Sequence, residues 1–320
     1  MVSARSMQWL RFAISNIARI TGCRRLAGVE AAILLAAGLL LPFAAWPASV
    51  ADDRGATVSV AGPAERVVSL APFITELVFA AGGGDSLVAV SEHSDFPEAA
   101  RHLPRIGNAF SVNLERLLAV QPDLVVSWQS GIDPRIVERL ESMGIPVFVL
   151  EPRELEDVAS ALRRLGRLLG SEEAADEKAR EFTAAIDGIR NRYAGRATVS
   201  VFYQISRRPL MTLNGEHMIS DILAICGGAN VFHGLSPIAP TVNREQVLAA
   251  DPEVILISAA TGRAPESLAY WRRYPAMTAV RHGNLYTVDG GVLNRQTPRL
   301  ADGVGWVCEI LDRARENMVE

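Results

Sequence analysis

The chain has 320 residues, of which 49% are hydrophobic and 21% charged, so it is long and apolar enough for two domains with buried cores. The charged fraction is too small for a disordered chain. The 32 basic and 36 acidic residues give a net charge of −4, without a basic patch or stripe, which argues against nucleic acid as a partner.

The first 51 residues have the pattern of a secretory signal. Residues 1–30 carry five arginines and a single acid, and a mostly apolar run follows over residues 31–45. This run is shorter than the roughly twenty residues of a membrane-spanning helix. Small residues at Ser49 and Ala51 then suit a signal peptidase. We predict a signal peptide over residues 1–51; its retention as an N-terminal anchor is the alternative.

Removal of that segment leaves 27 basic and 35 acidic residues, a net charge of −8, and only two cysteines, Cys226 and Cys308. An even pair in an exported protein predicts a disulfide. Closing its loop of about 80 residues would stabilise the fold by about 4.5 kcal/mol in the chain-entropy treatment. Two buried free thiols are the alternative.

Strands and helices alternate through the rest of the chain. In the first half, β-branched runs between proline and glycine predict strands, and apolar spacing of three and four predicts helices. The expected strands are 67–70, 87–90, 124–128 and 146–150, and the expected helices are 75–81, 114–120, 134–143 and 155–169. In the second half we expect strands at 199–204, 254–258 and 285–288, and helices at 218–226 and 301–315.

One long helix separates the two halves. Residues 171–193 contain no proline and one glycine, Ser171 can cap the helix, and acids fill its first turn. Its length is about six turns, or roughly 35 Å. Because alternating strands and helices form parallel sheets covered on both faces, we predict an α/β protein of two Rossmann-like lobes with mostly parallel sheets. The N-terminal lobe covers 52–170, the linker helix 171–194 and the C-terminal lobe 195–320.

Each lobe contains one copy of a repeat. The first copy, residues 112–128, reads VNLERLLAVQPDLVVSW, and the second, residues 242–258, reads VNREQVLAADPEVILIS. In both copies an asparagine starts a helix, a proline ends it and a buried strand follows. The repeat keeps an acid at its fourth position, Glu115 and Glu245. The helix dipole favours such an acid by only a few tenths of a kcal/mol, and a duplicated unit would inherit it.

Several segments, in order, resemble a known family. RVVSLAPFITELVFAAG, SEHSDFP, NLERLLAVQPDLVVSW, GGANVF and NREQVLAADPEVIL are similar to the periplasmic cobalamin-binding proteins of ABC importers. These belong to the class III binding proteins, whose lobes are joined by one long helix. The resemblance implies a periplasmic solute-binding protein that captures cobalamin or a related corrinoid. Haem or a ferric siderophore is the alternative ligand, because proteins of this class bind several kinds of metal chelate with the same fold.

The resemblance also implies a partner. In this family one glutamate per lobe docks into arginine pockets on the two transmembrane subunits of the importer, and the matching residues are Glu115 and Glu245. Two related acids suit a partner with two-fold symmetry. We therefore expect a monomer that docks on an ABC permease dimer with its ATPase subunits.

The ligand should lie between the lobes, beyond the carboxyl ends of the strands. That rule selects Phe73, His93, Trp128, Tyr203 and Gln204, together with the loop that follows residue 288. Large aromatic side chains suit a flat ring such as a corrin. By family position His93, Trp128 and Arg295 match pocket residues, and Arg295 would contact amide or carboxylate groups. Trp128 as a cap on the core and His93 as a solvated loop residue are the alternatives.

The chain departs from the cobalamin binders at three pocket positions. Ala109 and Phe110 stand where those proteins have a tryptophan before the first repeat, and Phe110 could replace the lost ring. Ala239 stands at a second tryptophan position, and Gly291 replaces an acid near the last loop. These departures leave a corrinoid as the predicted ligand.

Neither an enzyme nor a metal site is predicted. The sequence has no G-x-S-x-G elbow, no phosphate-binding loop and no paired catalytic constellation. Its five histidines lack a ligand spacing such as H-x-x-x-H, so we expect no bound metal and no cofactor. An exported α/β enzyme and a membrane-anchored sensor are the remaining alternatives.

Overall fold

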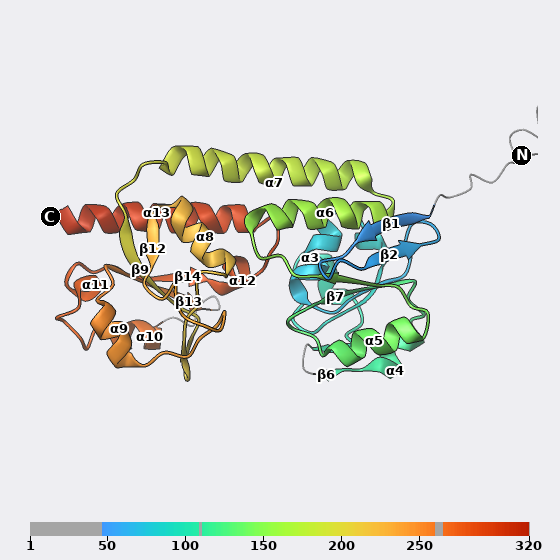
Figure 1. Cartoon of the computed structure of the whole chain (residues 1–320), viewed down its shortest axis with the longest axis horizontal. Coiled ribbons are helices and arrows are strands. Elements are labelled where there is room, and N and C mark those ends of the chain that lie inside the picture. The colour runs from blue at the N-terminus through green and yellow to red at the C-terminus, as the bar shows by residue number, and fades with distance from the viewer. Residues whose placement is uncertain (1–46, 109–110, 260–264, 320) are drawn as a thin grey trace, which may run out of the picture. The chain divides into compact units, whose positions relative to one another are not determined.

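Two four-stranded parallel sheets form the centre of the protein in the computed structural model, which describes residues 47–108, 111–259 and 265–319 (Figure 1). The N-terminal sheet has the order β4-β3-β7-β8, with β3 Val67–Ser69, β4 Leu87–Val90, β7 Leu124–Trp128 and β8 Val147–Leu150. The C-terminal sheet has the order β12-β9-β13-β14, with β9 Val199–Gln204, β12 Gly228–Asn230, β13 Val254–Ala259 and β14 Leu285–Asp289. Numbered along the chain within each half, both orders are 2-1-3-4. The predicted α/β fold is confirmed, and the two halves share one topology.

The strands are apolar because helices cover both faces of each sheet. In the N-terminal lobe, which we define as the described residues up to 170, the helices are α3 Pro72–Ala80, α4 Leu114–Ala119, α5 Pro134–Ser142 and α6 Leu155–Leu169. In the C-terminal lobe, residues 195–319, they are α8 Met218–Ile225, α9 Arg244–Ala250, α10 Pro265–Trp271, α11 Thr278–Arg281, α12 Gly290–Leu293 and α13 Leu300–Val319. Short antiparallel pairs join β5 Gly107–Asn108 to β6 Ser111–Val112, and β10 Ser206–Arg207 to β11 Leu210–Met211.

The long helix α7, Glu172–Tyr193, lies between the lobes in sequence and packs against both α6 and α13 (Figure 1). Its buried side chains include Ala175, Ala179, Phe182 and Ile186, at the helical spacing of three and four. Ser171 precedes the first helical residue, but its side chain does not form the cap hydrogen bond that was predicted. Its hydroxyl instead donates a hydrogen bond to the carbonyl of Ala81, 2.6 Å away, and so ties the start of α7 to the end of α3.

One hydrophobic core runs through both lobes. A single cluster of buried residues includes Val67 of β3, Leu165 of α6, Phe182 of α7, Val201 of β9 and Val307 of α13. One smaller cluster lies on the other face of each sheet. The lobes are therefore joined by continuous packing as well as by the chain.

A hairpin precedes the N-terminal sheet, at the end of the predicted signal peptide. Strand β1, Ala48–Ala51, pairs with β2, Thr57–Val60, and Val50 is buried in the common core. A cut after Ala51 would remove one strand of this hairpin. The rest of the predicted signal, up to residue 46, lies outside the described residues.

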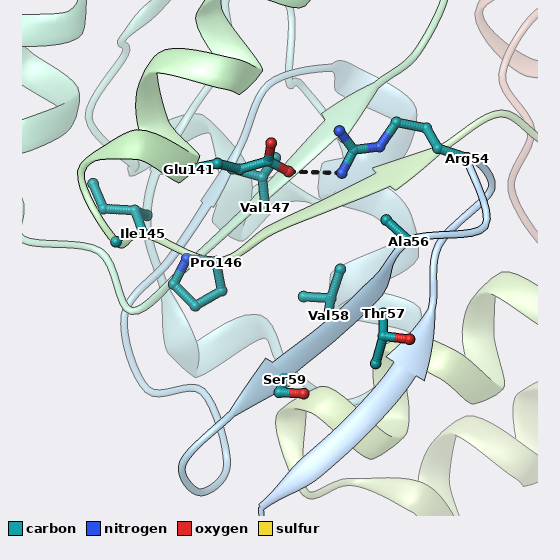
Figure 2. A pocket seen from close by; sticks show the side chains of 10 residues that line it. Arg54, Ala56, Thr57, Val58, Ser59, Glu141, Ile145, Pro146 and Val147 are labelled. Atoms are coloured by element: carbon teal, nitrogen blue, oxygen red, sulfur yellow. Dashed lines mark hydrogen bonds and ion pairs between the residues drawn. The ribbon is translucent and has the colours of Figure 1, made fainter.

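A shallow pocket of about 270 Å³ separates this hairpin from the end of α5 and the start of β8 (Figure 2). At its edge Arg54 pairs with Glu141 at 2.8 Å, and Val58 and Pro146 contribute apolar lining. Among the described residues, no helix combines the length and the apolar character that crossing a bilayer requires.

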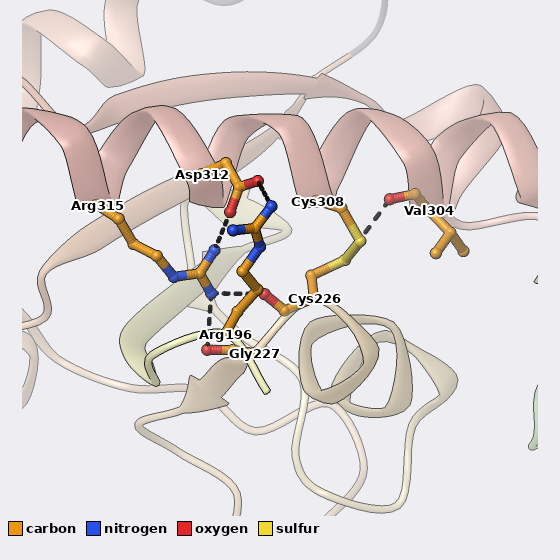
Figure 3. Close-up of a disulfide and its surroundings, with 7 residues drawn as sticks. All are labelled: Arg196, Cys226, Gly227, Val304, Cys308, Asp312 and Arg315. Atoms are coloured by element: carbon orange, nitrogen blue, oxygen red, sulfur yellow. Dashed lines mark hydrogen bonds and ion pairs between the residues drawn. A yellow bond between two sulfur atoms is a disulfide. The ribbon is translucent and has the colours of Figure 1, made fainter. Parts of the chain in front are cut away.

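The predicted disulfide is present between Cys226 and Cys308, whose Cα atoms are 4.6 Å apart (Figure 3). It joins the end of α8 to the middle of α13, and both residues are fully buried. Nearby, Arg315 of α13 donates hydrogen bonds to the carbonyls of Cys226 and Gly227 at 2.6 and 3.2 Å. The last helix is thus held to the end of α8 by one covalent bond and two hydrogen bonds.

Candidate functional site

Polar contacts between the lobes come from segments that follow the carboxyl ends of strands. Helix α3 follows β3, the loop 91–97 follows β4, and α12 with the loop behind it follows β14. Arg295 and Arg299, beyond α12, bind groups on the other two segments. The carboxyl ends of both sheets therefore meet at one place, which we call the lobe junction. Ligands of α/β proteins bind beyond this edge of a sheet.

Glu76 of α3 is the centre of the lobe junction. Its side chain is 3% exposed and accepts hydrogen bonds from two arginines of the other lobe. Arg295 Nη1 lies 2.7 Å from Glu76 Oε1. Arg299 binds through Nη2 to Oε1 and through Nε to Oε2, each at 2.9 Å. This bidentate geometry fixes the orientation of the guanidinium and compensates the buried carboxylate.

Arg295 reaches a second carboxylate on its more open side. Its Nη1 atom also donates to Asp95 Oδ1 at 2.7 Å, and Nη2 donates to the carbonyl of His93 at 3.2 Å. The Asp95 side chain is 61% exposed, whereas that of Arg295 is 17% exposed. Burial alone would raise the pKa of Asp95, but the hydrogen bond and the charge of Arg295 hold that pKa below its ordinary value.

The loop that carries Asp95 has further contacts at the lobe junction. His93 has a left-handed backbone conformation, with φ of 64°, and its carbonyl points to Arg295. The guanidinium of Arg299 lies over the ring of Phe96, 4.0 Å from its centroid. Such cation–π contacts help to hold the two lobes together at this edge.

Replacing Glu76 by glutamine is expected to lower the free energy of unfolding by about 2 kcal/mol, because two guanidiniums then lose their buried counter-charge. This expected loss of free energy is smaller than for a fully buried ion pair, because the arginine side chains are 17% and 28% exposed. Urea unfolding measures it. Glu98→Gln removes an acid that is 73% exposed and should change the same quantity by less than about 0.5 kcal/mol. Equal effects of the two substitutions would contradict a stabilising role for Glu76.

Two of the predicted aromatic residues contact each other. The rings of Phe73 in α3 and Trp128 at the end of β7 meet edge to face, with centroids 5.8 Å apart. Phe73 is 5% exposed and belongs to the core, whereas Trp128 is half-buried. A Cβ atom at Gly131 would lie 1.8 Å from the Trp128 ring, so the absence of a side chain there lets the backbone cover that ring.

Tyr203 supports the loop that carries Arg295. It is 1% exposed, and its hydroxyl donates to Asn294 Oδ1 at 3.1 Å. Burial raises the pKa of this hydroxyl, which therefore stays protonated as a donor. Asn294 in turn donates to Ser258 at 3.0 Å. The predicted residue Phe110 lies outside the described residues.

The structure thus brings together His93 with Arg295 and Phe73 with Trp128, whereas Tyr203 reaches the junction through Asn294. Three important residues were not predicted from the sequence: Glu76, Asp95 and Arg299. One signal for Glu76 was available, since it is the only charged residue in the apolar helix PFITELVFA. A charge in the middle of an apolar helix requires a partner.

Glu115 and Glu245 occupy equivalent places in the two repeats. Each lies in the first turn of a short helix whose asparagine cap, Asn113 or Asn243, accepts a backbone hydrogen bond at 3.0 or 2.8 Å. Both glutamates are exposed. Glu245 forms an ion pair with Arg244, whereas the described part of the chain offers the Glu115 side chain no such partner. The backbone hydrogen bond first, and then Arg244, lower the pKa of Glu245, so it is ionised at neutral pH.

Within the described ranges, no group of three or more histidine, cysteine, aspartate or glutamate side chains has the arrangement of a metal site. Carboxylates and guanidiniums at the junction instead neutralise each other. Such a site can supply fixed hydrogen-bond donors and acceptors to an organic ligand.

Comparison with known proteins shows sequence similarity to periplasmic binding proteins. Residues 67–291 match the family of periplasmic binding proteins. The chain is 36% identical over 255 residues to a vitamin B12-binding protein of Vibrio cholerae. The aligned region covers 79% of this chain and 91% of that protein. A vitamin B12-binding protein of Yersinia pestis is 34% identical over 246 residues, or 77% of this chain and 86% of that protein.

Solved structures agree. The periplasmic vitamin B12-binding protein BtuF of Vibrio cholerae has a TM-score of 0.74 and 35% identity, over 79% of this chain and 98% of that one. The periplasmic heme-binding protein RhuT of Roseiflexus has a TM-score of 0.70 at 23% identity, over 78% of this chain and 98% of that one, which shows a shared fold only. The chain belongs to the family of periplasmic binding proteins.

Proposed function

We propose that this protein is the solute-binding component of an ABC importer and that it captures cobalamin or a related corrinoid between its lobes. The observation that carries the proposal is sequence identity. More than a third of the aligned residues are identical to those of a vitamin B12-binding protein, along 91% of that protein's length. The lobe junction supports it. Trp128 offers an aromatic surface, and Arg295 offers hydrogen-bond donors, at the edge of the sheets where ligands of α/β proteins bind.

Docking to the permease would use Glu115 and Glu245. Both are exposed, both stand in the first turn of equivalent helices, and neither contacts the lobe junction in the described structure. Charge complementarity of this kind directs encounter and register more than it adds affinity. The protein would act as a monomer in the periplasm, exported by a signal that ends before the hairpin of β1 and β2, and would bind its ligand without chemical conversion.

Isothermal titration of the mature protein with cyanocobalamin, cobinamide and hemin tests the ligand. We expect saturable binding of one cyanocobalamin per protein, at least about tenfold tighter than hemin, a difference of about 1.4 kcal/mol. Cobinamide, which lacks the nucleotide, separates recognition of the corrin ring from recognition of the nucleotide. Heat with hemin and none with either corrinoid would overturn the proposed ligand.

A further inference from the structure

The charges at the lobe junction balance, and this balance bears on which chemical groups can approach Arg295. Two carboxylates, Glu76 and Asp95, face two guanidiniums, Arg295 and Arg299. The neighbouring Arg101 is itself paired with Glu98 at 3.2 Å. A ligand group that reaches this place meets a site of zero net charge, in which the exposed acid lies beside the arginine.

The hydrogen bonds within the protein leave N–H donors of Arg295 and acceptor capacity of Asp95 available to a ligand. A guanidinium has five N–H donors. Those of Arg295 bind Glu76 and Asp95 through Nη1 and the His93 carbonyl through Nη2, so two donors have no protein acceptor within the described ranges. Asp95 uses Oδ1 for Arg295, and in the same described part of the chain no other side chain donates a hydrogen bond to its carboxylate.

A primary carboxamide matches this combination. Its carbonyl oxygen accepts from a guanidinium N–H, and its NH₂ group donates to a carboxylate oxygen. A carboxylate of the same shape has acceptors only, so one of its oxygens would face Asp95 and bring an uncompensated negative charge. Like charges placed together in a binding site weaken the complex strongly. The side chains at the periphery of a corrin ring end in primary carboxamides.

We propose that Asp95 and Arg295 act together as a carboxamide-binding pair, and that Asp95 makes this protein reject ligands with a carboxylate at that position. The proposal rests on the proposed function, since it assigns one part of a corrinoid to one part of the lobe junction. It gives Asp95 a role in specificity that is separate from the buried contacts of Glu76. Arg295 alone, without Asp95, would favour the carboxylate.

The test compares cyanocobalamin with its monocarboxylic acids, in each of which one peripheral propionamide is hydrolysed to a propionate. Each is titrated at pH 7 against the wild-type protein and the Asp95→Asn variant. For at least one isomer we expect the wild-type protein to bind the acid at least about tenfold more weakly than the amide. Asp95→Asn should reduce this ratio to within about threefold. Because the readout is a ratio, a general loss of affinity in the variant does not affect it.

Glu138→Gln is the control, since it removes an exposed acid of the same lobe that is paired with neither Arg295 nor Arg101, and it should keep the wild-type ratio. Equal binding of the amide and every acid by the wild-type protein would overturn the proposal, and so would an unchanged ratio in Asp95→Asn. Either result would leave the proposed function intact. Failure of the wild-type protein to bind any of these corrinoids would overturn the proposed function, and the proposal with it.

Discussion

Replacing Glu115 and Glu245 together by alanine will reduce uptake of cyanocobalamin by whole cells at least about tenfold, while the affinity of the purified protein stays within about twofold. Each carboxylate is exposed in the first turn of its helix, and neither contacts the lobe junction in the described structure. Their loss should therefore affect recognition of the permease and leave ligand capture unchanged. Uptake of labelled ligand and titration of the purified variant measure the two effects separately.

A matched control removes one exposed helical acid from each lobe outside the repeats, Glu138 and Glu309, and should leave uptake unchanged. The single variants are expected to differ, because Glu245 already has an ion-pair partner in Arg244 and Glu115 has none in the described part of the chain. A partner that binds Glu245 must compete with Arg244, so Glu115→Ala should lower uptake more. Normal uptake by the double variant would show that these acids do not dock the protein.

Removing the disulfide will have the largest effect on stability. The bond joins residues separated by 82 positions, and in the chain-entropy treatment a loop of that length corresponds to about 4.5 kcal/mol, an upper value. Cys226→Ala with Cys308→Ala should therefore lower the free energy of unfolding by up to that amount, as measured by urea unfolding. Alanine is preferred to serine because both positions are fully buried, where removing a hydroxyl from water costs free energy.

Reduction of the wild-type protein is an independent route to the same state. It should shift the unfolding midpoint toward that of the double alanine variant, whereas the same reductant should not affect the variant. Ligand affinity at 25 °C should be similar in all three, since the bond lies between α8 and α13, away from the lobe junction. An unchanged midpoint after complete reduction would contradict the prediction.

Most of the fold could be predicted because its signals are local. Apolar periodicity and bounding prolines or glycines predicted β7 at 124–128, α6 at 155–169 and β9 at 199–204, with the bounds that the structure has. The linker helix starts after Ser171 as predicted, but the Ser171 hydroxyl binds the Ala81 carbonyl instead of capping the first turn of α7. That contact joins residues 90 positions apart, and no local pattern could reveal it.

The candidate site was less predictable because its geometry depends on the approach of two lobes. The rule on strand ends selected His93, Trp128 and the loop of Arg295 correctly as neighbours of the sheet edges. It could not show that Arg295 binds Glu76, 219 positions away, because that pairing depends on tertiary structure. The hairpin of β1 and β2 was also missed, since residues 48–51 were interpreted by their small side chains as a processing site.

The continuous core has a thermodynamic consequence. Two lobes with separate cores would unfold as separate units, each with its own transition. Here the apolar contacts of α6, α7 and α13 belong to one cluster, so neither lobe can melt without exposing part of the surface that the other buries. Unfolding should then be cooperative over the described chain. For the same reason, opening of the lobes is restricted to small movements, since a large rotation would expose the apolar contacts of α6, α7 and α13 to water.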